Sequence, residues 1–109
     1  MPKSDKLQGS LDLMTLKVLS RRPSIHGYAI ISAIRQISEE ILKVEDGSLY
    51  PALHRMEEEG WVSAFWGESE NNRRAKYYRL SKAGEKQLEA ETRRWSRISL
   101  AIGQALEAS

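Results

Sequence analysis

The chain has 109 residues, of which 29% are charged and 40% are hydrophobic, with a formal net charge of +2 and no cysteine. This length and composition indicate one globular domain, and the lack of cysteine excludes disulfides and thiolate metal sites, which is compatible with a reducing cytoplasm. No apolar run approaches the roughly 20 residues that span a bilayer, and no signal-peptide core is indicated near the start, so we expect a cytoplasmic protein without a membrane partner.

Two helices are predicted in the first third of the chain. Apolar residues at helical spacing predict one over residues 10–22, and a serine-capped helix is expected over residues 24–38. Tyr28 is expected on the buried stripe of this second helix, as a core aromatic with its hydroxyl near the surface. His26 is interpreted as a helix-start residue and not as a metal ligand, because no second ligand is suitably spaced.

The segment "GSLYPALHRMEEEGW", residues 47–61, predicts a third helix that Asp46 or Ser48 could cap. With Ser48 as the cap, Pro51 is the third helical residue and removes no helical hydrogen bond. An apolar stripe of Leu49, Leu53 and Met56 then faces the core. The residues left on the side away from the core are Tyr50, Pro51, His54 and Arg55.

After this helix the pattern changes to strict alternation, which predicts two strands, near residues 61–67 and 75–80, joined by a polar loop. Residues 71–79 contain four cations and no acid, next to a segment rich in glutamate. A local basic patch of this kind fits a surface that meets an anion, although a solvated charged loop is the alternative. The hairpin residues expected to contact the anion are Asn72, Arg73, Arg74 and Lys76.

A last helix is predicted over residues 82–107, with Ser81 as its cap. It would be roughly 37 Å long, which is more than so small a domain needs for its own core. Its apolar residues recur at seven-residue spacing, which favours packing on a second copy of the chain, with folding back onto its own domain as the alternative. The residues expected at this dimer contact are Leu88, Trp95, Ile98, Ile102 and Leu106.

Three helices followed by a hairpin is the order of a winged helix-turn-helix. The predicted fold class is therefore mostly α with a small β-hairpin (α+β), in one compact unit. Residues 1–80 are expected to bind DNA, and residues 81–109 to form a long C-terminal dimerisation helix. In such folds the third helix presents its N-terminal end to the major groove, and the hairpin, or wing, reaches phosphates or the minor groove.

Three blocks of the sequence resemble the PadR family of bacterial transcriptional regulators: "HGYAI" at 26–30, "GSLYPALHRMEEEGWV" at 47–62 and "RRAKYYRLSKAG" at 73–84. The length resembles the short subfamily, which has a single C-terminal helix. This resemblance implies a dimeric repressor that binds an inverted-repeat operator in double-stranded DNA. In some members of the family an aromatic effector releases the DNA.

The resemblance also implies roles for individual residues. Ser48, Tyr50 and Pro51 match the DNA-facing motif, whereas His54 and Arg55 match positions that vary and could set sequence preference. Trp95 matches an aromatic position at the dimer centre, where it could line an effector pocket or simply fill the dimer core. The positions that match the basic wing are Arg73, Arg74 and Lys76.

Other classes of function are less well supported by the residues. A protein-interaction module that meets an acidic protein is the main alternative, because winged helices can serve in that way. An enzyme is not expected: neither histidine has a nucleophile beside it in sequence, and Glu57, Glu58 and Glu59 point in different directions around a helix. No cofactor, no metal site and no glycine-rich phosphate loop is indicated.

Overall fold

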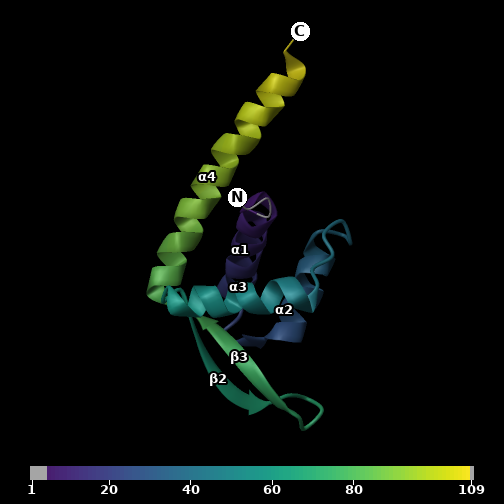
Figure 1. The fold of residues 1–109 in the computed structure, drawn as a ribbon, viewed down its shortest axis with the longest axis vertical. Helices are drawn as coiled ribbons and strands as arrows, with labels where there is room; N and C mark the ends of the chain where they lie inside the picture. The colour runs from purple at the N-terminus through teal and green to yellow at the C-terminus, as the bar shows by residue number, and fades with distance from the viewer. Residues whose placement is uncertain (1–4, 109) are drawn as a thin grey trace.

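The structure is a computed structural model that describes residues 5–108. The predicted order of three helices, a hairpin and a long last helix is confirmed (Figure 1). The chain also forms one additional short strand. The elements are α1 (Asp5–Ser20), β1 (Ile25–His26), α2 (Gly27–Ile37), α3 (Asp46–Glu58), β2 (Val62–Glu68), β3 (Arg74–Leu80) and α4 (Lys82–Glu107).

The core lies where α1, α2 and α3 meet above the sheet. Each of these helices contributes a stripe of apolar side chains at helical spacing, so that burial of the stripes holds the three helices together. The predicted inward stripe of α3 is confirmed, since Leu49, Leu53 and Met56 are all fully buried. The other large, fully buried apolar side chains are Leu16, Val18, Leu19, Ile30 and Ile34.

The additional strand β1 pairs with β3 and makes the sheet three-stranded, in the order β1-β3-β2. The prediction that residue 24 caps α2 is wrong, because the N-cap is His26, whose Nδ1 accepts a hydrogen bond from the N–H of Ala29 at 3.3 Å. The prediction that His26 is a helix-start residue is confirmed. Its imidazole also lies edge-on against the Tyr77 ring of β3, with centroids 5.4 Å apart, so one residue ends the strand and begins the helix.

Tyr28 does not lie in the core, and the prediction of a core aromatic is wrong: its exposed fraction is 70%. The buried face of α2 is centred on Ile30 and Ile34. A residue two positions before Ile30 is rotated by about 200° around a helix of 3.6 residues per turn, so Tyr28 lies on the opposite face.

The start of α3 also differs from the prediction. The N-cap is Glu45, which makes no side-chain cap hydrogen bond, while its carbonyl accepts from the N–H groups of Ser48 at 2.9 Å and Leu49 at 3.0 Å. The helix therefore begins at Asp46, and Pro51 is its sixth residue, inside the helix. The carbonyl of Gly47, four residues earlier, consequently receives no helical N–H. Because Gly47 is exposed, water can satisfy this carbonyl.

The hairpin of β2 and β3 forms the predicted wing. The strands pair in antiparallel register from Val62 with Leu80 to Glu68 with Arg74. At the tip, the N–H of Ser69 donates to the carbonyl of Arg73 at 2.8 Å, and Asn72 adopts a left-handed backbone with φ of 60°. Asparagine is one of the few residues that tolerate this conformation, so the tight tip follows from the sequence.

The last helix, α4, packs its first half on α1 and β3 and extends beyond the domain with its second half (Figure 1). The predicted cap is confirmed: the Ser81 hydroxyl accepts from the N–H of Gly84 at 3.0 Å and donates to the carbonyl of Gly60 at 2.6 Å. The molecule is elongated, 58 × 29 × 28 Å, because the end of α4 and the wing tip point in opposite directions.

Thr15 is a buried polar residue of α1 whose hydroxyl has no hydrogen-bond partner in the part of the chain that the structure describes. We expect Thr15→Val to raise the free energy of unfolding by about 1 kcal/mol, because valine has nearly the same shape and removes an unsatisfied buried group. Urea denaturation measures this difference. Thr92→Val is the matched control on an exposed hydroxyl that donates to the carbonyl of Leu88 at 2.7 Å. A stabilisation shared by both variants would contradict the role of burial at position 15.

Candidate nucleic-acid interface

The outward face of α3 carries the residues expected to read DNA. Ser48, Tyr50, Pro51 and His54 are all exposed, on the side of the helix opposite to its buried stripe. Since they occupy the first two-thirds of α3, they form a polar and aromatic surface at the N-terminal end of the helix. In helix-turn-helix proteins the N-terminal residues of the recognition helix are the ones that contact base edges in the major groove of DNA.

Tyr50 is positioned by a close approach between α3 and α2. Its exposed fraction is 42%, and its ring lies over Gly27, the first residue of α2. A Cβ atom at position 27 would stand 2.6 Å from the Tyr50 hydroxyl, so glycine is needed there to admit the ring. The sequence blocks 26–30 and 47–62 thus meet at the contact between Gly27 and Tyr50.

His54 remains largely solvated. Its Nε2 lies 3.3 Å from a carboxylate oxygen of Glu58, one turn later on α3, and the two side chains are 72% and 69% exposed. Exposed pairs of this type contribute at most about 1 kcal/mol, so the imidazole can exchange this partner for another at little cost.

Arg55 is engaged within the fold, and the structure corrects its placement away from the core. Its two terminal nitrogens donate to the two carboxylate oxygens of Asp12 on α1, each at 2.9 Å, and its side chain is 36% exposed against 14% for Asp12. These hydrogen bonds raise the pKa of Arg55 above its ordinary value. The forked pair spans 43 positions in sequence and fixes α3 against α1. A guanidinium has five N–H donors, so Arg55 still has donors for a phosphate.

We expect Asp12→Asn to lower the free energy of unfolding by about 1–2 kcal/mol, because it leaves the half-buried Arg55 without its counter-charge. Thermal and urea unfolding measure the loss. The control is Glu91→Gln, which removes the carboxylate from a pair with Arg94 at 2.8 Å between adjacent turns of α4. Arg94 is 55% exposed and Glu91 is 20% exposed, and an ion pair of this kind within one helix should change stability by less than about 0.5 kcal/mol. Equal losses in the free energy of unfolding for the two substitutions would show that the Asp12–Arg55 pair stabilises the fold no more than an ion pair within one helix.

The wing presents cations that lie on aromatic rings. The guanidinium of Arg74 lies 4.7 Å from the centroid of Trp66, which is 57% exposed, and that of Arg79 lies 4.8 Å from the Phe65 ring on the other face of the hairpin. A stacked guanidinium keeps its N–H donors at the free edge, where they can meet phosphates. Trp66 was not among the interface residues predicted from the sequence. It could have been predicted, because it is an aromatic residue in an alternating strand that precedes a strand rich in cations.

Lys76 links the wing to α3. Its ammonium lies 3.6 Å from a carboxylate oxygen of Glu57 on α3 and 5.8 Å from the ring centroid of Tyr78. Burial raises the pKa of the Tyr78 hydroxyl above its ordinary value, and this hydroxyl therefore stays neutral. Asn72 and Arg73, at the tip, are exposed. The wing thus contacts α3 through Lys76, and its tip carries the exposed Arg73 and Arg74 next to the exposed Glu68 and Glu70.

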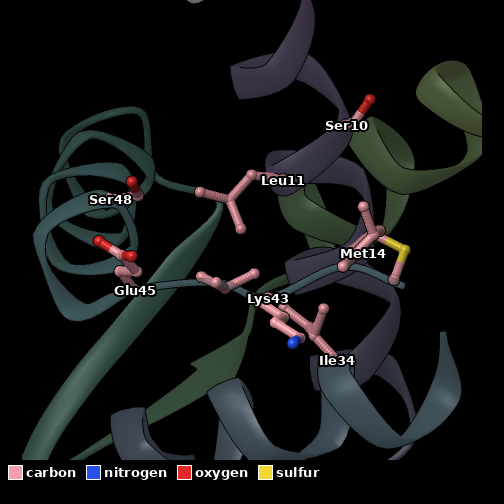
Figure 2. Close-up of a pocket in the computed structure, with 9 residues that line it drawn as sticks. Ser10, Leu11, Met14, Ile34, Lys43, Glu45 and Ser48 are labelled. Carbon is pink, nitrogen blue, oxygen red and sulfur yellow. The ribbon is translucent and has the colours of Figure 1, made fainter. Parts of the chain in front are cut away.

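A pocket of about 280 Å³ lies between α1, the end of α2, the connection from α2 to α3 and the first turn of α3, where Ser48 lines it (Figure 2). It is separate from Trp95, which is 43% exposed on the surface of α4. A surface hollow lies on the same helix, lined by Arg94, Arg97, Ile98 and Ala101.

The described residues form neither a metal site nor a membrane-spanning helix. Among residues 10–45 and 47–108, whose side chains the structure describes, there is no group of three or more histidine, aspartate or glutamate side chains that could hold a metal ion. Within the same range, no helix combines the length and the apolar character that a membrane crossing requires.

Comparison with known proteins identifies relatives over nearly the whole chain. The family described as "Transcriptional regulator PadR-like family" matches residues 15–90. A transcriptional regulator from Clostridium thermocellum is 28% identical, with a TM-score of 0.82 over 93% of this chain and 97% of that one. A PadR-like transcriptional regulator from Bacillus cereus is 26% identical, with a TM-score of 0.80 over 97% and 100% of the two chains. A curated protein of Lysinibacillus sphaericus is 24% identical over 98% of this chain and 97% of its own length.

Proposed function

We propose, from the premise that this chain belongs to the PadR-like family of transcriptional regulators, that it is a dimeric repressor of a palindromic operator. The observation that carries the proposal is the joint presentation of two elements. The wing adjoins α3, and the Lys76 ammonium of β3 lies 3.6 Å from a carboxylate oxygen of Glu57 on α3. A regulator of this kind, whose family is not one of enzymes, would act on genomic DNA in the cytoplasm.

The proposed docking places α3 in the major groove. Ser48 and Tyr50 would meet phosphates or sugars near the helix start, while His54 would face base edges further along. Arg55 would contribute in two ways, by holding the angle of α3 through Asp12 and by offering its remaining N–H donors to a phosphate. The wing would neutralise phosphates on the flank through Arg73, Arg74 and Lys76, with Asn72 at the tip.

The proposed dimer forms through α4. Of its apolar stripe, Leu88 packs against the domain's own core, whereas Trp95, Ile102 and Leu106 are 43%, 53% and 81% exposed, and Ile98 is half-buried. A row of exposed apolar side chains on a projecting helix is best stabilised by burial against another copy. Residues 1–80 would then serve as the DNA-binding part and residues 81–109 as the dimerisation part. Two copies of α3 would stand about 34 Å apart, which spaces half-sites by about 10 bp.

We expect Ile102→Glu to raise the dimer dissociation constant at least about tenfold, because it places a charge in the proposed apolar contact of both copies. Sedimentation across a concentration series measures the change. The matched control is Leu100→Glu: Leu100 is 64% exposed on the same helix but lies about 160° around the axis from residue 102. Wild-type chain that sediments as a monomer at micromolar concentration would refute the dimer.

The effector would be a flat aromatic molecule that lies between the two Trp95 rings of the dimer. Each ring contact would add roughly 0.5–1.5 kcal/mol to the free energy of binding, beyond the contribution of area burial. The alternative is that the two rings only fill the dimer core. Titration of the intrinsic fluorescence of a Trp95-only variant with planar aromatics distinguishes them, because a molecule between the rings would quench the emission.

Selection of bound duplexes from a random pool tests the whole function in one experiment. The expected product is an inverted repeat with half-sites about 10 bp apart, bound in a salt-dependent manner. Recovery of sequences without symmetry would refute the dimeric docking. Failure to enrich any duplex over competitor would refute DNA binding and favour the protein-interaction alternative.

A further inference from the structure

We propose that the open edge of β2 pairs with the β2 edge of another copy of the chain, so that the wings of two dimers join into one continuous antiparallel sheet. The pairing does not depend on DNA. Its consequence, the cooperative occupation of neighbouring operators, rests on the proposed function.

Hydrogen bonds at the two ends of the hairpin show which backbone groups of β2 point away from β3. At the base, the N–H of Ser81 donates to the carbonyl of Trp61 at 3.0 Å. At the tip, the N–H of Ser69 donates to the carbonyl of Arg73 at 2.8 Å. In an antiparallel ladder, residues that bond the neighbouring strand alternate with residues whose N–H and carbonyl point away from it. The residues of β2 whose backbone groups lie on the open side are therefore Val62, Ala64, Trp66 and Glu68.

Tyr77 closes this edge at the end near the wing tip. Its ring lies over Gly67, where a built Cβ would stand 3.3 Å from the ring, and its hydroxyl donates to the carbonyl of Glu68 at 2.8 Å. Within residues 5–108, no hydrogen bond reaches the outward backbone groups of Val62, Ala64 or Trp66. The part of the edge that can accept another strand therefore runs over residues 62–66.

The sequence of β2 lacks the usual protection of an edge strand. Natural edge strands are commonly blunted by lysine or proline, and VSAFWGE contains neither. Two neighbouring aromatic side chains are exposed instead, Phe65 at 37% on one face of the hairpin and Trp66 at 57% on the other. An open edge with exposed apolar side chains on both faces is best stabilised by a partner strand.

A second β2 matches this edge. When two copies run antiparallel about a two-fold axis at Phe65, Ala64 of each copy lies opposite Trp66 of the other, with their outward N–H and carbonyl groups facing each other. The small Ala64 leaves room for the indole, while the two Phe65 rings meet on the other face as a cross-strand aromatic pair. Glu68, the only charged residue of β2, lies opposite Val62, so no like charges meet. A shift by two residues in either direction would separate the two Phe65 rings.

The position of the wing leaves β2 accessible in the proposed α4 dimer. The wing tip and the end of α4 point in opposite directions (Figure 1). One chain can therefore contact one copy through α4 and another through β2. A strand pair of this size is weak in solution, but two dimers on one duplex would hold their wings at a high effective concentration.

The first test uses Phe65→Cys, whose thiol is the only one in a chain without cysteine. In the proposed pairing the two residues 65 are directly opposite, with Cα atoms about 4.5 Å apart, which suits a disulfide. Mild oxidation is expected to give a covalent dimer on a denaturing gel and at least to double the native mass in sedimentation. The matched control is Ser63→Cys on the same face, because the two residues 63 would lie about 13 Å apart and should cross-link at least about tenfold more slowly.

Equal cross-linking rates at positions 63 and 65 would overturn the pairing. A native mass that oxidation leaves unchanged would also overturn it, because the bond would then lie within one dimer. If neither cysteine variant cross-links, the edge is left to a strand of another protein, and the pairing of two copies is refuted.

The second test uses a duplex that carries two copies of the selected operator, at spacings that cover one helical turn. At the spacings that bring two wings together, occupation of one operator is expected to tighten binding to the other about tenfold. Ala64→Pro removes an outward N–H that the hairpin does not use, so it should abolish this gain and leave the affinity for a single operator unchanged. Ala64→Ser retains the N–H and should keep the gain.

A gain that survives Ala64→Pro, or that is absent at every spacing, would overturn the cooperative role of the wings. If Ala64→Pro fails to fold, Trp66→Ser, which removes the exposed indole, replaces it in the same assay. A wild-type chain that binds no operator would refute the proposed function, and the two cysteine variants would still decide whether β2 pairs with β2.

Discussion

Simultaneous replacement of Arg73 and Arg74 by alanine is expected to weaken binding to the operator and to non-specific duplex alike, on the order of 100-fold at moderate salt. Both side chains lie at the exposed end of the wing, and Arg74 is held over Trp66 with its donors free at the edge. If each neutralises one phosphate, the slope of log K against log salt should fall by about 1.8, since each phosphate contact contributes about 0.9. A loss that is uniform over sequences distinguishes phosphate contacts from base contacts.

Fluorescence anisotropy with a labelled duplex, over a series of salt concentrations, measures both quantities. The matched control is Arg93→Ala with Arg97→Ala, which removes the same two charges from exposed positions of α4, a helix that extends away from the wing (Figure 1). The control should leave the slope nearly unchanged. A double wing variant that retains the wild-type slope would show that the wing does not contact phosphates.

Gly84→Ala is expected to lower the free energy of unfolding by about 3 kcal/mol, even though alanine is the better helix former by about 1 kcal/mol. A Cβ at position 84 would overlap the carbonyl oxygen of Trp61 and stand 2.6 Å from Leu80 Cδ1. The backbone of Trp61 cannot easily retreat, because its carbonyl accepts the N–H of Ser81 at 3.0 Å. The substitution should therefore push the first turn of α4 off the domain.

Urea denaturation measures this loss, with Gly103→Ala as the control on the same helix. Apart from the nearby backbone of α4 itself, no described atom of the chain lies within 4 Å of a Cβ built at position 103, so alanine there should stabilise the chain by about 1 kcal/mol. Effects of opposite sign at the two glycines would establish that close approach, and not helix propensity, requires glycine at position 84. Stabilisation by both substitutions would contradict the tight docking of α4 on the Trp61 backbone.

The sequence by itself determined the parts of this protein that depend on local periodicity and local hydrogen bonds. The stripe of Leu49, Leu53 and Met56 and the alternating strands of the wing follow from side-chain geometry within one element. The cap at Ser81 and the role of His26 at the start of α2 follow from groups within a few residues of each other. The family resemblance followed from the same short blocks, and the match over residues 15–90 confirms it.

Only the tertiary structure decided the features that join distant segments. β1 has two residues, too few for any periodic pattern, and exists because β3 offers an edge to pair with. Tyr28 is exposed because the core packs on the face of α2 that carries Ile30 and Ile34, and Tyr28 lies on the opposite face. Arg55 turns toward Asp12, and the backbone of Trp61 imposes glycine at position 84. Each of these depends on which surfaces meet when the helices pack, and local propensity holds no information about such contacts between segments.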